Sequence, residues 1–95
     1  MSVSDINWAM RQRLPPTPRL LLIILADRAN SDTGMLEISI RELSRVTGIK
    51  FQDIIYYLEQ LQLDNYMIIY DYLETDEVEL NKIIGLNFNL DVVWS

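Results

Sequence analysis

The sequence contains neither cysteine nor histidine. The absence of cysteine excludes disulfide bonds, Cys-ligated zinc, iron–sulfur clusters and a thiol nucleophile. The absence of histidine removes the commonest general base and transition-metal ligand. Glycine is scarce as well, and Gly34, Gly48 and Gly85 do not form a phosphate-binding loop. We therefore expect a non-enzymatic protein with no metal, no cofactor and no small-molecule substrate.

Long hydrophobic runs are also missing. The longest, Leu20–Ala26, has seven residues, far fewer than the roughly 20 that cross a bilayer. An acidic residue near the start, and no small-residue cleavage site, disfavour a signal peptide. We expect no membrane association and a cytoplasmic location.

The 95 residues have room for one domain, spanning 1–95. Their 49% hydrophobic and 23% charged content is typical of a globular protein. The net charge of −6 is unevenly distributed. Residues 1–50 carry seven basic and five acidic side chains, whereas residues 51–95 carry only Lys82 against nine acids. Any contact with nucleic acid is therefore expected from the first half, because the second half repels phosphate.

Helical signals fill the first two thirds of the chain. A short helix is expected before Pro15, and Thr17-Pro18 is typical of an N-cap that opens a central helix to about Asn30. Met35–Ile38 is expected to be extended. Ser39 to Glu42 fits a capping box, and Ile40, Leu43 and Val46 fall on one face of the helix that follows it.

Gly48 is expected to end that helix in the left-handed conformation. Periodicity then resumes from Lys50 to about Leu63, with Ile54, Leu58 and Leu61 on one face. Two helices joined by a short glycine turn predict a helix-turn-helix. Extended segments follow at 67–73, 78–84 and 86–90, with a polar break at 74–77. The predicted fold is α+β: a winged helix with a three-helix core and a C-terminal β-hairpin wing.

Three stretches carry a resemblance to a known family. They are Trp8–Asn30, with its Leu25-Ala26-Asp27 ending, Ile40–Met67, and Leu86–Leu90. Together they resemble the N-terminal winged-helix domain of phage and plasmid replication-initiation proteins. The resemblance implies binding of double-stranded DNA, with the second helix of the motif in the major groove and the wing beside the backbone. It implies a role in replication initiation or transcription control.

Carried over by position, the resemblance directs the start of the Lys50 helix toward the bases. Gln52 can pair with adenine, and Lys50 suits guanine or phosphate. Tyr56 lies one turn on, with Asp53 and Glu59 as unfavourable neighbours of DNA. Arg41 and Arg45 are one turn apart and can contact phosphate, or can pair with Glu37 and Glu42. Arg11, Arg13 and Arg19 are either a basic arm or partners for the chain's own acidic segment.

The predicted wing departs from DNA-binding relatives of this kind. Glu74, Asp76, Glu77 and Glu79 stand where basic residues are usual. The alternative is therefore an interaction module, such as a phage-type inhibitor or a mimic of DNA charge, whose acids and tyrosines Tyr70 and Tyr72 bind a basic protein surface.

Tyrosines are concentrated in one part of the chain, and this leaves the oligomeric state open. By strand alternation Tyr66, Tyr70 and Tyr72 share one face, which either lies on the core or forms a contact surface. A homodimer through this hairpin, or through the N-terminal helix, is one expectation. Trp94 either packs on the Trp8 segment or belongs to a longer context.

Overall fold

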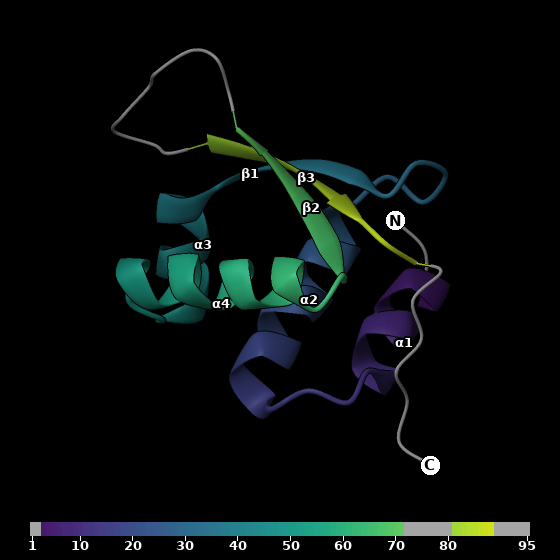
Figure 1. The fold of residues 1–95 in the computed structure, drawn as a ribbon, viewed down its shortest axis with the longest axis horizontal. Helices are drawn as coiled ribbons and strands as arrows, with labels where there is room; N and C mark the ends of the chain where they lie inside the picture. Colours follow the sequence, from purple (N-terminus) through teal and green to yellow (C-terminus); the bar gives the residue numbers. More distant parts are fainter. Residues whose placement is uncertain (1–2, 72–80, 89–95) are drawn as a thin grey trace.

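The computed structural model describes residues 3–71 and 81–88 (Figure 1). In chain order these residues form α1 (Val3–Arg11), α2 (Pro16–Arg28), β1 (Met35–Ser39), α3 (Ile40–Thr47), α4 (Phe51–Leu63), β2 (Met67–Asp71) and β3 (Asn81–Leu86). The expected α+β class is confirmed, and the element order is compatible with a winged-helix-like arrangement.

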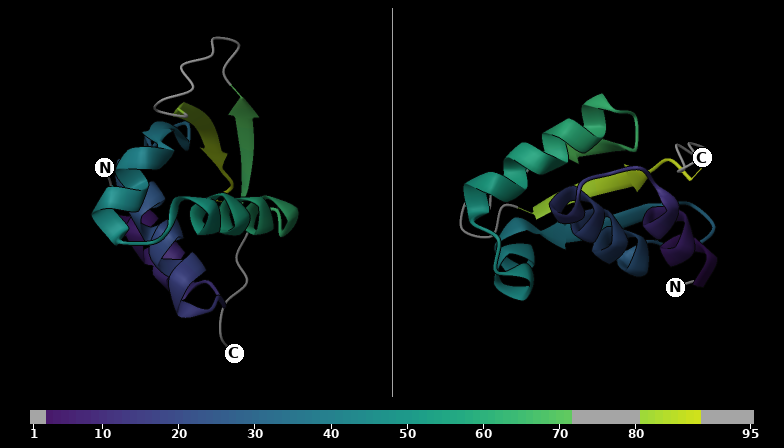
Figure 2. Two further views of the ribbon diagram at one scale, coloured as in Figure 1. Left: turned by 90° about the vertical axis from the view of Figure 1, so that its left-hand side faces the viewer. Right: turned by 90° about the horizontal axis from the view of Figure 1, so that it is seen from below.

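The three strands form one antiparallel sheet in the order β1-β3-β2. The central strand β3 is continuous through Gly85, which pairs with Met35 on one side and Ile68 on the other. The expected division at this glycine into two extended segments is therefore wrong, because pairing with both neighbours holds the strand together. Helices α2 and α4 lie on the same side of the sheet (Figures 1 and 2).

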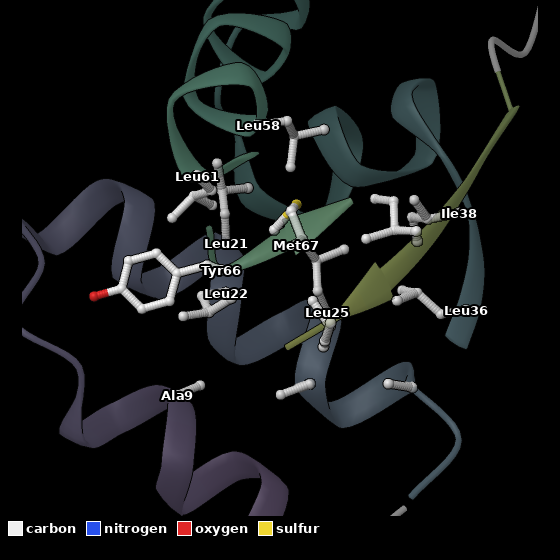
Figure 3. Close-up of a cluster of buried hydrophobic side chains, with 14 of the residues drawn as sticks. Ala9, Leu21, Leu22, Leu25, Leu36, Ile38, Leu58, Leu61, Tyr66 and Met67 are labelled. Carbon is white, nitrogen blue, oxygen red and sulfur yellow. The ribbon is translucent and has the colours of Figure 1, made fainter. Parts of the chain in front are cut away.

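The hydrophobic core lies between that side of the sheet and the helices (Figure 3). Helix α2 contributes Leu21, Leu22 and Leu25, all fully buried, so its prediction as a central helix is confirmed. Helix α4 contributes Ile54, Leu58 and Leu61, the three residues predicted to share one face, and all three are buried. Alternate strand residues complete the core, namely Leu36, Ile38, Met67, Ile84 and Leu86.

Helix α1 is attached to this core through aromatic rings. The buried Trp8 makes edge-to-face contacts with Phe88, at a centroid distance of 4.9 Å, and with Tyr66, at 6.3 Å. One turn further along the chain, Gln12 is fully buried, and its Nε2 donates to the Trp8 carbonyl at 2.7 Å. The N-terminal helix is thus joined to the start of β2 and the end of β3. The expected contact between Trp94 and the Trp8 segment involves a residue outside the described ones.

The predicted N-cap is wrong for α2 and correct for α3. The predicted N-cap at Thr17 is wrong, because α2 begins at Pro16 and its N-cap is Pro15. Proline fits the first turn, where its missing N–H is not needed. The cap at Ser39 is confirmed, since its Oγ accepts from Glu42 N at 3.2 Å. The Glu42 carboxylate forms an ion pair with Arg28 Nη1 at 3.4 Å.

Two predictions about residues that share one face differ from the structure. Val46 is 55% exposed, because it is in the last turn of the eight-residue α3, where the chain leaves the core to enter α4. The expected single face for Tyr66 and Tyr70 is also wrong. Tyr66 precedes β2 in a turn that buries it against Trp8, whereas Tyr70 lies within the strand on its exposed side.

Left-handed backbone is required at two glycines. Gly48 closes α3 with φ 75°, as predicted, and its N–H donates to the Ser44 carbonyl at 2.8 Å. Gly34 has φ 72° at the entry to β1, where a Cβ would lie 2.8 Å from the Leu86 carbonyl oxygen. A side chain is therefore excluded at Gly34 by the neighbouring backbone as well as by its φ.

Candidate nucleic-acid interface

The turn between α3 and α4 is fixed by side-chain hydrogen bonds. Ser44 Oγ donates to the Ile49 carbonyl at 2.6 Å. Thr47 Oγ1 donates to the Leu43 carbonyl at 2.8 Å and accepts from Ile49 N at 3.1 Å. These bonds hold residues 48–50 in one conformation, so the angle between the two helices is set locally. The predicted pair of helices joined by a short glycine turn is therefore present.

The two arginines of α3 are brought next to the start of α4. Arg41 and Arg45 are exposed, lie one turn apart, and line a shallow hollow together with Ser44 and Phe51. Phe51 is the first residue of α4 and had no predicted role. The sequence carried no signal for its position here, because that position depends on how α3 crosses α4. Lys50, the N-cap residue of α4, is exposed as well.

Helix α4 presents polar and aromatic groups on the side away from the core. Gln52 and Tyr56 are exposed on successive turns, and Tyr56 is 57% exposed. The Tyr56 ring packs edge-to-face on Tyr57 at a centroid distance of 5.4 Å. Asp53 is also exposed on this part of the helix. The structure therefore places all five predicted DNA-contacting residues on exposed parts of α3, α4 and their turn: Arg41, Arg45, Lys50, Gln52 and Tyr56.

Glu59, the second acid expected to disfavour DNA, lies at the side of α4 toward the sheet. It lines a partly enclosed hollow together with Ile55 and Gln62 of the same helix, and Ile69 and Lys82 complete the wall from the sheet. The Gln62 side chain accepts from Ile69 N at 2.7 Å. Glu59 therefore lines the same hollow as the basic Lys82 of β3.

The other arginines lie on separate surfaces. Arg28 of α2 is the ion-pair partner of Glu42. The carboxylate of Glu42 therefore points to α2, whereas the sequence predicted that it could pair with Arg41 and Arg45. Arg13 and Arg19 line another shallow hollow, with Leu14, Pro15 and Pro16. Whether Arg11, Arg13 and Arg19 form a basic arm stays a prediction.

Acidic and basic side chains are balanced over most of the structure. The side chains of residues 5–70 and 82–88 comprise eight acids and eight bases, so the six excess acids of the chain lie at positions 71–79 and 91. The predicted interaction residues Tyr72, Glu74, Asp76, Glu77 and Glu79 lie outside the described residues. Tyr70 is described and is 46% exposed.

Within residues 3–71 and 81–88, no group of three or more metal-ligating side chains lies together. In the same ranges no helix has the length and apolar character needed to cross a bilayer. Comparison with protein-family models, curated proteins and solved structures gives no match.

Proposed function

We propose that this chain is a non-enzymatic winged-helix protein that binds double-stranded DNA. Helix α4 enters the major groove, and Arg41, Arg45 and Lys50 contact phosphates beside it. As for phage and plasmid proteins of this type, the role is in the initiation of replication or the control of transcription, in the cytoplasm.

The order of elements supports the winged-helix assignment. A helix, a strand, two helices joined by a short turn and a β-hairpin follow one another from α2 to β3. The last strand inserts between the other two, in the order β1-β3-β2. This topology leaves the second helix of the helix-turn-helix unit with one side on the core and the other exposed, as a groove-reading helix requires.

The observation that carries the proposal is the hollow shared by Arg41, Arg45 and Phe51. It places two cations next to the first turn of a 13-residue helix, which is about 20 Å long at 1.5 Å per residue. The major groove is wide enough to admit an α-helix. Cations beside the start of α4 can then contact the phosphates at the edge of the groove. Gln52 and Tyr56 then lie where base edges are exposed.

Titration of a fluorescent duplex at several salt concentrations tests the proposal. Each phosphate contact lowers the logarithm of the binding constant by about 0.9 per decade of salt. Three contacts from Arg41, Arg45 and Lys50 predict a slope between about −2 and −3. The proposal is wrong if anisotropy detects no binding to duplex DNA at low salt.

The position of the excess acids favours a second candidate, binding to a basic protein surface. Replacing Glu74, Asp76 and Glu77 by lysine separates the two functions, because it removes the negative charge that such a partner needs and also removes repulsion of phosphate. Duplex affinity is expected to rise in this variant if the chain binds DNA. Unchanged or weaker DNA binding by the variant, or loss of a protein partner that the native chain captures, favours the second candidate.

A further inference from the structure

We propose that the exposed side of α4 selects A·T over G·C pairs in the major groove, with Gln52 reading adenine and Tyr56 reading the methyl group of thymine. This inference rests on the proposed binding of duplex DNA and names the class of sequence that is bound. Gln52 and Tyr56 thus determine specificity, whereas the phosphate contacts provide affinity without sequence preference.

Gln52 and Tyr56 lie on the side of α4 that is opposite the core. Successive residues of an α-helix are about 100° apart around its axis. Gln52 and Tyr56 are four residues apart and therefore differ by only about 40°, whereas the buried Ile54 and Leu58 lie about 200° and 240° from Gln52. Both Gln52 and Tyr56 are exposed, and α4 lies at the periphery of the described structure (Figure 2). When α4 enters a groove, these two side chains face its floor.

Helix α4 carries no side chain suited to guanine. Its 13 residues, Phe51–Leu63, include neither arginine nor lysine, the residues that bind guanine O6 and N7. Lys50 is the N-cap that precedes the helix, and the proposed function assigns it to phosphate. The amide of Gln52 instead matches adenine, because it donates to N7 and accepts from the N6 amino group.

The ring of Tyr56 is positioned to contact a methyl group. It is 57% exposed and packs edge-to-face on Tyr57, with 5.4 Å between the ring centroids and 69° between the ring planes. Tyr57 is half-buried against the core and therefore anchors the exposed ring. Thymine presents its C5-methyl group in the major groove, where apolar side chains contact it.

The spacing of the two side chains matches the spacing of base pairs. Four residues rise about 6 Å along a helix axis, and the nucleotides of one strand are about 3.4 Å apart. Gln52 and Tyr56 therefore contact base pairs about two steps apart.

The acids of α4 do not reverse this preference. A carboxylate on the floor of the groove accepts from cytosine N4, but Asp53 lies about 100° around the helix from Gln52 and faces the groove wall instead. There it opposes phosphate and lowers the affinity for every duplex alike. Glu59 lines the hollow that also contains Lys82.

Competition titrations with duplexes of equal length, composed of alternating A·T, G·C or inosine·cytosine pairs, test the proposal. An inosine·cytosine pair resembles G·C in the major groove and A·T in the minor groove, so it separates reading in the two grooves. The native chain is expected to bind the A·T duplex about tenfold more tightly than the other two, the order of discrimination that one bidentate contact provides. Replacing thymine by uracil, which lacks the methyl group, is expected to weaken binding severalfold.

Three variants assign the preference to single residues. Gln52→Ala is expected to remove most of the preference for A·T over G·C, and Tyr56→Ala to remove the difference between thymine and uracil duplexes. Arg45→Ala is the matched control, because the loss of a phosphate contact lowers the affinity for all duplexes by the same factor. Circular dichroism verifies that the variants fold.

The results distinguish failure of this inference from failure of DNA binding. Equal binding of the A·T and G·C duplexes, a preference for G·C, or an inosine·cytosine duplex bound as tightly as A·T overturns the inference while duplex binding stands. An A·T preference that survives Gln52→Ala also overturns it. Absence of binding to every duplex at low salt overturns the proposed function together with the inference.

Discussion

Replacing both Arg41 and Arg45 by alanine is expected to weaken binding to duplex DNA about 100-fold at low salt. Each arginine makes a charged hydrogen bond to phosphate worth about 1.5 kcal/mol, and the two together correspond to about two decades of affinity. The double variant is also expected to reduce the magnitude of the salt slope by about 2, because two phosphate contacts are lost. Anisotropy titrations over a series of salt concentrations measure both quantities.

The matched control is the double replacement of Arg13 and Arg19, which removes the same charge from a different surface. Arg13 and Arg19 line the hollow beside Leu14–Pro16, whereas Arg41 and Arg45 adjoin α4. If Arg13 and Arg19 are partners for the chain's own acids, the second of the two roles predicted for them, the control is expected to retain most of the affinity and to keep the salt slope. Equal losses in the two double variants would show that the chain attracts DNA only through general charge, and the interface on α3 and α4 would be rejected.

Trp8→Ala is expected to lower the free energy of unfolding by about 3–5 kcal/mol, the usual cost of removing a large buried aromatic side chain. Trp8 is 4% exposed and contacts Tyr66 and Phe88. Its loss leaves a cavity where α1 meets the ends of β2 and β3. The total free energy of unfolding of a small domain is about 5–15 kcal/mol, so this variant is close to unfolding. Urea denaturation followed by circular dichroism measures the change.

Two further variants define what Trp8 contributes. Trp8→Phe keeps an aromatic ring in the same place and is expected to recover part of the lost stability. Met10→Ala alters an exposed residue of the same helix and is expected to change the free energy of unfolding by less than about 0.5 kcal/mol. If Trp8→Ala unfolds at the same urea concentration as Met10→Ala, α1 does not depend on the aromatic contacts described above.

The helical part of the fold was predictable because its signals are local. The spacing of Ile54, Leu58 and Leu61 identified the buried side of α4, and Gly48 marked the end of α3. The exposure of Val46 was not predictable, because it depends on where the chain turns away from the core. The same reason explains Tyr66 and Tyr70: alternation assigns a shared side only within a strand, and β2 begins after Tyr66.

The candidate site was predictable to a similar degree. Arg41 and Arg45 were recognisable as neighbours because residues four apart lie on one side of a helix. The addition of Phe51 to their hollow, and the position of Glu59 toward the sheet, depend on how α3, α4 and the sheet pack together. Which residues share the outer side of the sheet depends on the pairing of β1 with β3, which are distant in the sequence.

Nuclear magnetic resonance tests the central claim most directly, and a chain of 11.2 kDa is well suited to it. Adding duplex DNA to the ¹⁵N-labelled protein is expected to shift amide signals within Arg41–Arg45 and Lys50–Tyr56. Signals of Ile68 and Tyr70 on the outer face of the sheet are expected to stay in place. Shifts confined to the sheet or to α1, or no shifts with excess duplex at low salt, would contradict DNA binding through α3 and α4.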